Sequence, residues 1–252
     1  MISRSIPVIA FMLWVIATLH ASDTATLQQA AEAYQAKDFR TAANQYEALI
    51  SAGYTDAGLY YNLGNCYAAM HDRGRAILNY EKALRIKPYF RDARHNLMLV
   101  SQPVEDVIAV LPPFFLVRWL RAAANFLTVT GWAVLTILLS WVVLAMLIIY
   151  IWFQDRLSRS WSLPLGILTL SLLLFSAGLG WYRNHLQNDD SVAVVMQEGS
   201  DFKYAPEENS ETIHALPAGT RVELVDTIGA WYKVILTNKD EGWVEKSAVE
   251  HL

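Results

Sequence analysis

Two long runs without a charged residue constrain this chain more than any other feature of its sequence. The first, residues 131–153, holds about 23 residues, which at about 1.5 Å per residue is enough to cross roughly 30 Å of hydrocarbon. The second, residues 161–182, is similar in length and also uncharged. Ser176, Gly178 and Gly180 in this second run are small enough to let another helix approach closely. The sequence therefore predicts two transmembrane helices.

The segments that flank these runs carry the information on orientation. Tryptophan marks both ends of each run, as expected where an indole lies between lipid and water, at Trp132, Trp152, Trp161 and Trp181. The connection 154–160 carries Arg156 and Arg159, and short loops with basic residues favour the cytoplasm. Because further arginines flank the opposite side, at 118, 121 and 183, the arginine count alone leaves the orientation open.

The N-terminal residues 1–22 have the layout of a secretory signal peptide. Arg4 precedes an apolar run, residues 6–19, and small residues follow at Ala21 and Ser22. Leu19 is not ideal at the position three residues before a cleavage site after Ala21, so an uncleaved N-terminal anchor is the alternative. Either form exports the residues that follow it, and this resolves the orientation.

The predicted topology has one cytoplasmic loop, residues 154–160, and water-soluble parts on the outer side of the membrane. A linker, residues 103–130, precedes the first span, and another, residues 183–190, follows the second. Residues 112–127 mix large apolar side chains with two arginines, which is typical of a helix lying along the membrane surface. A plain loop-plus-helix linker explains this segment equally well.

The segment before the first linker, residues 23–102, has the spacing of a helical repeat. Residues 60–88 resemble a tetratricopeptide repeat (TPR), with signature positions at Tyr60, Leu63, Gly64, Tyr67, Ala76, Tyr80, Ala83 and Pro88. In this spacing the first helix buries one apolar stripe, the small Gly64 and Ala76 let two helices cross closely, and Pro88 ends the second helix.

A weaker repeat precedes residues 60–88 in the chain, and a single helix follows them. Leu27, Ala31, Tyr34, Phe39, Ala42 and Tyr46 fill related positions, with the turn one residue short. Residues 91–102 place Leu97, Met98 and Val100 towards one side and are expected to form a capping helix. Because about three repeats are usually needed for stability, completion is expected from the cap, the membrane surface or another protein.

The resemblance to TPR domains implies a groove that binds a partner protein. Its groove positions are occupied here by Gln28, Glu32, Gln35, Tyr61, Asn62, Asn65 and His95. An asparagine at the position of Asn65 often holds the backbone of a bound peptide in that family. The alternative is that these polar side chains are simply solvated. Cys66, the one cysteine, is expected to be a packing residue, and no internal disulfide can form.

The C-terminal residues 191–252 change to short alternating segments separated by turn residues. Four segments, residues 191–197, 220–228, 230–236 and 241–246, alternate in the manner of half-buried strands of a small barrel. This part resembles the bacterial SH3-like domain through Gly219, Trp231, Tyr232, Val234, Gly242, Trp243 and Val244. It departs from that pattern at Ala230, where the family most often has glycine.

The SH3-like resemblance implies binding to proteins or to cell-wall peptides. Phe202, Tyr204 and the polar tip of Tyr232 are predicted to form an exposed aromatic surface that contacts a partner, whereas Trp231 and Trp243 are expected to lie in the core. The acidic loop at 206–211 occupies the place that related barrels use for ligands. An acidic tail argues against nucleic acid as a partner.

The sequence carries no arrangement of residues that predicts an enzyme, a cofactor or a metal site. No serine elbow, phosphate-binding glycine loop or zinc spacing is present, and the six histidines are scattered. We therefore expect no catalytic residue and a role without enzymatic activity.

The fold class predicted for the whole chain is a multidomain membrane protein: all-α TPR hairpins, two transmembrane helices and a C-terminal all-β SH3-like barrel. This order resembles the BatE-type proteins of bacterial aerotolerance operons. The resemblance implies a location in the bacterial inner membrane, with both soluble domains on the periplasmic side, and partners among von Willebrand-type membrane proteins and a MoxR-type ATPase.

Two functions follow as hypotheses from this architecture. The favoured one is a membrane-anchored adaptor whose two exported domains bind partner proteins in an envelope complex. The alternative is a cell-wall sensor or anchor that binds peptidoglycan through the SH3-like domain. A transporter subunit is remote, because the spans contain no acidic or basic residue to line a path.

Overall fold

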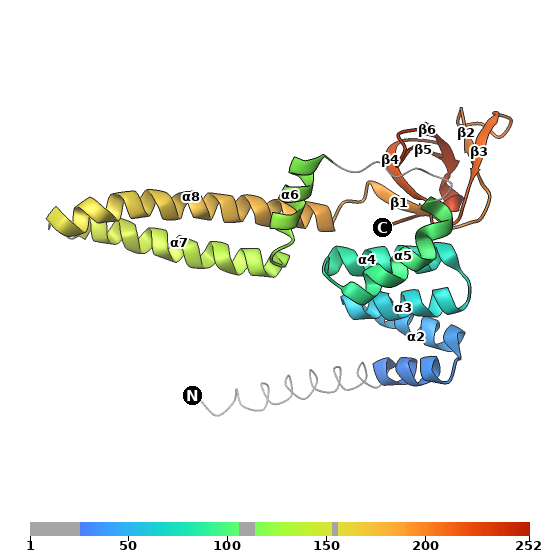
Figure 1. The fold of residues 1–252 in the computed structure, drawn as a ribbon, viewed down its shortest axis with the longest axis horizontal. Helices are drawn as coiled ribbons and strands as arrows, with labels where there is room; N and C mark the ends of the chain where they lie inside the picture. The colour runs from blue at the N-terminus through green and yellow to red at the C-terminus, as the bar shows by residue number, and fades with distance from the viewer. Residues whose placement is uncertain (1–25, 106–113, 153–155) are drawn as a thin grey trace, which may run out of the picture. The chain divides into compact units, whose positions relative to one another are not determined.

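The computed structural model describes residues 26–105, 114–152 and 156–252, and it divides into two compact units (Figure 1). The first unit is built from Met1–Val110 together with Asp190–Leu252, and the second is Leu111–Asp189. The predicted signal peptide, residues 1–22, lies outside the described residues. The chain thus leaves its first unit, forms the second, and returns to complete the first.

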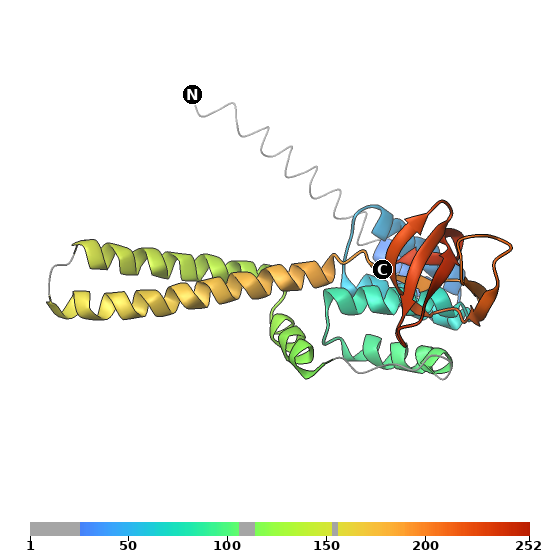
Figure 2. The ribbon, with the colours of Figure 1, turned by 90° about the horizontal axis from the view of Figure 1, so that it is seen from above.

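The N-terminal part of the first unit is mostly helical. A helical segment, 26–35, is followed by α2 (Phe39–Ser51), α3 (Ala57–Ala69), α4 (Arg73–Ile86) and α5 (Arg91–Glu105). Each helix from α2 to α5 packs against the next one along the chain (Figure 2). Asp38, Asp56 and Asp72 cap the starts of α2, α3 and α4, where each carboxylate accepts a hydrogen bond from a backbone N–H of the first turn.

The two turns that join paired helices have the same form. Lys37 and His71 take positive φ angles of 62° and 61°, and each is followed by the aspartate that caps the next helix. The capping residues Asp38 and Asp72 are 34 residues apart. Both donate their backbone N–H to the residue five positions earlier, Ala33 and Tyr67. The expectation of a turn one residue short is therefore wrong, because Ala33, and not Tyr34, is the counterpart of Tyr67.

The core of the helical part is built on close helix packing. Ala42, Tyr46, Leu63 and Ala76 are buried together in one cluster that continues through α2, α3 and α4. Gly64 is required there, because a Cβ on it would lie 2.7 Å from the ring of Tyr80.

The C-terminal part of the first unit is an antiparallel sheet of seven strands in the order β3-β2-β6-β5-β4-β1-β7. The strands are β1 (Val192–Val195), β2 (Ser200–Lys203), β3 (Thr212–Leu216), β4 (Arg221–Ile228), β5 (Trp231–Leu236), β6 (Glu241–Glu245) and β7 (Val249–His251), with a short 3-10 helix at Lys246–Ala248. A two-residue turn joins β4 to β5, in which Gly229 takes a φ of 56° that glycine adopts at little cost. The sheet is consistent with the predicted SH3-like barrel.

The helices and the sheet of the first unit share a small apolar core. Ile77 and Leu78 of α4 pack with Val194 of β1, and Leu97 and Val100 of α5 lie against the same cluster. Ion pairs surround it, including Lys82 to Glu250 at 3.6 Å and Arg221 to Glu81 at 3.6 Å. The sheet therefore covers one end of the helical array and buries apolar side chains there. Met98, expected on the packed side of α5, is exposed instead.

The second unit contains α6 (Phe115–Ala124), α7 (Val129–Trp152) and α8 (Arg156–Gln187). The helices α7 and α8 pack along each other as a hairpin (Figure 1). Thr136 and Ser176 share a hydrogen bond of 2.9 Å across this contact. A Cβ on Gly180 would lie 3.0 Å from Cβ of Trp132, so Gly180 permits the close approach that the sequence predicted, whereas Gly178 faces open space.

Two of these helices are long and apolar enough to cross a membrane, by length and composition. The candidate spans are Val129–Trp152, with a mean hydropathy of 2.8, and Trp161–Gln187, with 1.9. The most apolar 18 residues of the first candidate span are not buried inside the protein. Water would contact a large apolar surface there if no lipid covered it. Helix α8 begins at Arg156 and ends at Gln187, so both the predicted loop 154–160 and the predicted linker 183–190 are largely helical.

Candidate functional site

The predicted groove of the helical part contains a network of polar side chains. Oδ1 of Asn65 accepts hydrogen bonds from the hydroxyl of Tyr80 at 2.7 Å and from Nδ2 of Asn96 at 2.8 Å. Burial raises the pKa of Tyr80 to about 12, so its hydroxyl remains a donor at neutral pH. Tyr61 lies beside this network, with its ring 4.9 Å from that of Phe90. Asn65 is thus engaged within the protein, although the resemblance implied that it holds a bound peptide.

The other predicted groove residues lie nearer to solvent. Gln28, Glu32 and Gln35 are exposed and follow one face of the helical segment 26–35, and Gln28 donates a hydrogen bond of 2.9 Å to Glu32. Asn62 is half-buried, and His95 is exposed on α5. The structure therefore joins Tyr61 and Asn65 through Asn96, a residue that the sequence interpretation missed because nothing in its spacing distinguishes it.

Cys66 is a buried packing residue in the helical core. Burial raises the pKa of its thiol to about 11, which keeps it protonated and unreactive at neutral pH. Among the described residues, no cluster of three or more histidine, cysteine, aspartate or glutamate side chains could hold a metal ion.

The predicted aromatic surface of the barrel is only partly present. Phe202 is 0% exposed and packs against Gly242, where a Cβ would lie 2.5 Å from the Phe202 ring. The expectation that Phe202 contacts a partner is therefore wrong, because its side chain fills the space above a glycine in the neighbouring strand. Tyr204 is 65% exposed, in agreement with its predicted position. The hydroxyl of Tyr232 shares a hydrogen bond of 3.2 Å with Nε2 of His251.

The tryptophans of the barrel differ from their prediction as well. Trp231 and Trp243 are half-buried and do not belong to the buried core of the sheet. Lys203 places its ammonium group 5.4 Å from the centre of the Trp231 ring and donates a hydrogen bond of 2.6 Å to the carbonyl of Glu208. This lysine connects the half-buried indole to the acidic loop next to Tyr204.

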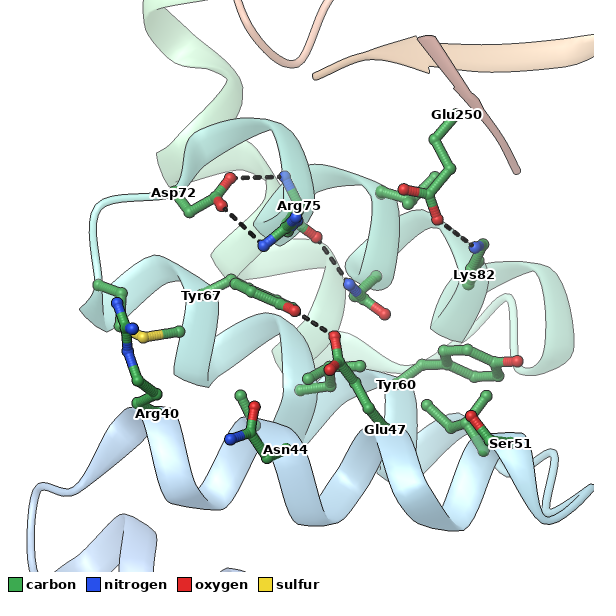
Figure 3. A pocket seen from close by; sticks show the side chains of 16 residues that line it. Arg40, Asn44, Glu47, Ser51, Tyr60, Tyr67, Asp72, Arg75, Lys82 and Glu250 are labelled. Carbon is green, nitrogen blue, oxygen red and sulfur yellow. Dashed lines mark hydrogen bonds and ion pairs between the residues drawn. The ribbon is translucent and has the colours of Figure 1, made fainter. Parts of the chain in front are cut away.

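A cleft of about 750 Å³ lies on the side of α3 opposite the predicted groove (Figure 3). Tyr60, Leu63 and Tyr67 line it from α3, whereas Tyr61 and Asn65 belong to the other face of that helix. The cleft is also lined by α2, by α4 and by Glu250 of β7. Sequence reasoning missed this cleft, because it involves a strand that the alternation pattern did not reveal.

A model of the family described as the bacterial SH3 domain matches residues 205–250. The match begins after β2 and ends within β7. The strands β1 and β2 belong to the same sheet but lie outside the matched residues. No curated protein is found to match the chain. The protein thus combines a mostly helical N-terminal part, two helices long and apolar enough to span a membrane, and a C-terminal bacterial SH3 domain.

Proposed function

We propose that this protein is a non-enzymatic, membrane-anchored adaptor that presents a TPR-type helical array and an SH3 domain to partner proteins outside the cytoplasmic membrane. One observation carries the proposal: Leu78 of the helical part and Val194 of the barrel share an apolar core, although the membrane hairpin separates them in the sequence. The two parts belong to one compact unit, and bacterial SH3 domains commonly bind proteins or peptidoglycan.

The shared core also supports the proposed topology. Two segments that pack together must lie in the same compartment, so the chain between them crosses the membrane an even number of times. Two spans meet that requirement. Reporter fusions within residues 154–160 and after Leu252 should report opposite sides, with the C-terminal reporter active in the periplasm. A cytoplasmic C-terminus would contradict the proposed topology.

The helical array supports a TPR assignment through its repeat. The caps Asp38 and Asp72 are 34 residues apart, which is the period of this family. The aromatic pair Tyr46 and Tyr80 has the same separation, and both side chains are buried. These features favour a solenoid that binds a polypeptide, in a complex of the kind that BatE-type proteins are associated with.

Anchoring to the membrane is proposed to involve α6 as well as the hairpin. Phe115 and Trp119 on α6 are exposed, and the indole N–H of Trp132 on α7 donates a hydrogen bond of 2.8 Å to the carbonyl of Ala124. This contact fixes the end of an amphipathic helix against the spans, which favours a position of α6 along the membrane surface.

Co-purification of the full chain in mild detergent tests the adaptor. We expect membrane proteins to be recovered with it, von Willebrand-type proteins and a MoxR-type ATPase among them, and we expect Tyr204→Ser to reduce their recovery through the barrel surface. Recovery of lipid and chaperones alone would refute the adaptor. Retention of the full chain on purified cell-wall sacculi, with loss in the Tyr204→Ser variant, would favour the peptidoglycan-binding alternative.

A further inference from the structure

The cleft between α2 and α4 has polar walls above a partly apolar floor. Leu63 and Leu78 contribute to the floor, and both side chains are buried. Arg40, Asn44, Glu47 and Ser51 stand along one face of α2, at spacings of four, three and four residues (Figure 3). At about 1.5 Å per residue this wall is roughly 17 Å long, which matches about five residues of extended chain.

All three carboxylates of the cleft already have partners within the protein. Asp72 pairs with Arg75 at 3.7 Å and also accepts a hydrogen bond from the Arg75 backbone N–H. Glu250 pairs with Lys82 at 3.6 Å, and Glu47 accepts a hydrogen bond from the hydroxyl of Tyr67. Asp72 and Glu250 thus pair with two of the three cations, and Glu47 is held by a tyrosine hydroxyl.

The groups left for a ligand can all donate hydrogen bonds. Among the described residues, no side-chain partner is found for Arg40, Asn44, Ser51 or Tyr60, all of which line the cleft. Arg40 carries five N–H donors and no acceptor. Burial raises the pKa of Tyr60, so its hydroxyl stays protonated and can donate. A ligand that supplies acceptors, and carboxylates in particular, complements this set.

We propose that the cleft binds an extended, acidic polypeptide segment, with a carboxylate of that segment paired to Arg40. The segment lies along α2, and its backbone carbonyls accept hydrogen bonds from Asn44, Ser51 and Tyr60. The inference rests on the proposed function only in taking the ligand to be a polypeptide. It adds a second binding surface, on the face of α3 opposite the predicted TPR groove.

The barrel takes part in this site through one residue. Glu250 of β7 reaches the end of the cleft at Lys82 and so neutralises the second cation there. Among the described residues, Arg40 at the opposite end is therefore the cation of the cleft without an ion-pair partner, which gives the segment a direction. Because Glu250 belongs to the C-terminal part, a bound segment contacts both parts of the first unit.

Titration of the detergent-solubilised full chain with a synthetic peptide tests the site. The probe is an acetylated and amidated hexapeptide of alternating glutamate and alanine, and its glutamine counterpart serves as the uncharged control. Fluorescence anisotropy of the labelled peptide should show binding of the glutamate form and much weaker binding of the glutamine form. Arg40→Glu should weaken binding of the glutamate peptide about tenfold or more, as loss of a charge-assisted hydrogen bond predicts.

Arg91→Glu is the matched control, since Arg91 is an exposed arginine on α5 outside the cleft. It changes the net charge equally and should leave the affinity close to that of the natural chain. An equal loss of peptide affinity in Arg40→Glu and Arg91→Glu would mean that only the net charge of the protein matters, and it would overturn the site. Absence of any preference for the glutamate peptide in the natural chain would overturn it too.

The position of the peptide is measured separately by thiol labelling. Asn44→Cys introduces a reactive thiol in the cleft, because the natural Cys66 is buried. The glutamate peptide should slow labelling at position 44 but not at position 91 in Arg91→Cys, and unchanged labelling at both positions would contradict the site. Failure to co-purify partner proteins while the peptide still binds at Arg40 would refute the adaptor function and leave this site standing.

Discussion

Gly74 on α4 faces the backbone carbonyl of Met196, and a Cβ on Gly74 would lie 2.7 Å from that oxygen. The neighbouring carbonyl of Val195 would be 3.1 Å away. The start of α4 therefore approaches the end of β1 so closely that only glycine fits. This contact joins a residue before the α7–α8 hairpin to one after it in the sequence, and it lies beside the apolar cluster that holds the helices and the barrel together.

We expect Gly74→Ala to destabilise this contact. The added Cβ would meet backbone atoms that cannot rotate away, and overpacking of this kind costs about 1–3 kcal/mol. Better helix propensity would offset up to about 1 kcal/mol of that cost. Thermal unfolding in detergent should show a lower midpoint, and Gly74→Val should lower it further. Gly178→Ala is the control, since its Cβ would meet nothing within 4 Å, and an equal effect there would contradict the explanation.

Asn65→Ala should destabilise the helical part independently of any partner. The substitution removes the acceptor of two hydrogen bonds and leaves the hydroxyl of Tyr80 and the amide of Asn96 unsatisfied in a partly buried site. Leaving buried donors without a partner costs about 1–3 kcal/mol, and chemical denaturation should detect that loss. Gln35→Ala, at an exposed position of the predicted groove, should cost less. A variant with unchanged stability but reduced partner binding would instead favour the peptide-clamping role.

The stability of the helical part should fall at alkaline pH. Burial raises the pKa of the Cys66 thiol from its ordinary value of 9.0 to about 11, so the folded state holds the proton more tightly than the unfolded chain does. The stabilisation is therefore complete below pH 9.0 and is lost as the pH rises towards about 11. The free energy of unfolding, measured across that range, should fall less steeply in Cys66→Ala. Parallel pH profiles for the two proteins would contradict the expected role of the thiol.

Helical periodicity and composition predicted much of the fold. The described part of the run at 131–153 lies within α7, and the run at 161–182 lies within α8, because a long uncharged segment has few other stable structures. Four alternating segments of the tail correspond to β1, β4, β5 and β6. The strands β2, β3 and β7 were missed. β7 has only three residues, and β2 begins Ser-Asp, a polar pair that does not show the alternation.

The site was harder to predict than the fold, for a physical reason. Phe202 was expected in an exposed aromatic surface, yet it is buried against Gly242 of a strand distant in sequence. The cleft beside α2 likewise depends on Glu250 meeting Lys82, which lies before the α7–α8 hairpin in the sequence. Local patterns predict helices and strands, but contacts between distant segments carry the sites.

Gly242→Ala should destabilise the barrel strongly. A Cβ at this position would lie 2.5 Å from the ring of Phe202 and 3.0 Å from the carbonyl of Lys203. Both neighbours are buried, so the ring cannot turn away without opening the core, and we expect a loss at the upper end of about 1–3 kcal/mol. Calorimetry would measure it. Phe202→Leu in the same chain should recover part of the loss by freeing space, and failure of that rescue would refute the steric explanation.

Helix α6 is expected to contact lipid through its aromatic face. Phe115 and Trp119 form the aromatic face of this helix, and Trp119 is 69% exposed. Arg118 precedes Trp119 and so lies about 100° around the helix axis from it. In a Cys66→Ala background, a fluorescent probe attached at Trp119→Cys should be quenched by brominated lipids in nanodiscs, because an interfacial helix buries its apolar face about 5–10 Å into the headgroup boundary. The matched probe at Arg118→Cys should be quenched more by aqueous iodide. Iodide quenching of similar strength at both positions would mean that α6 lies in water and serves as a plain linker.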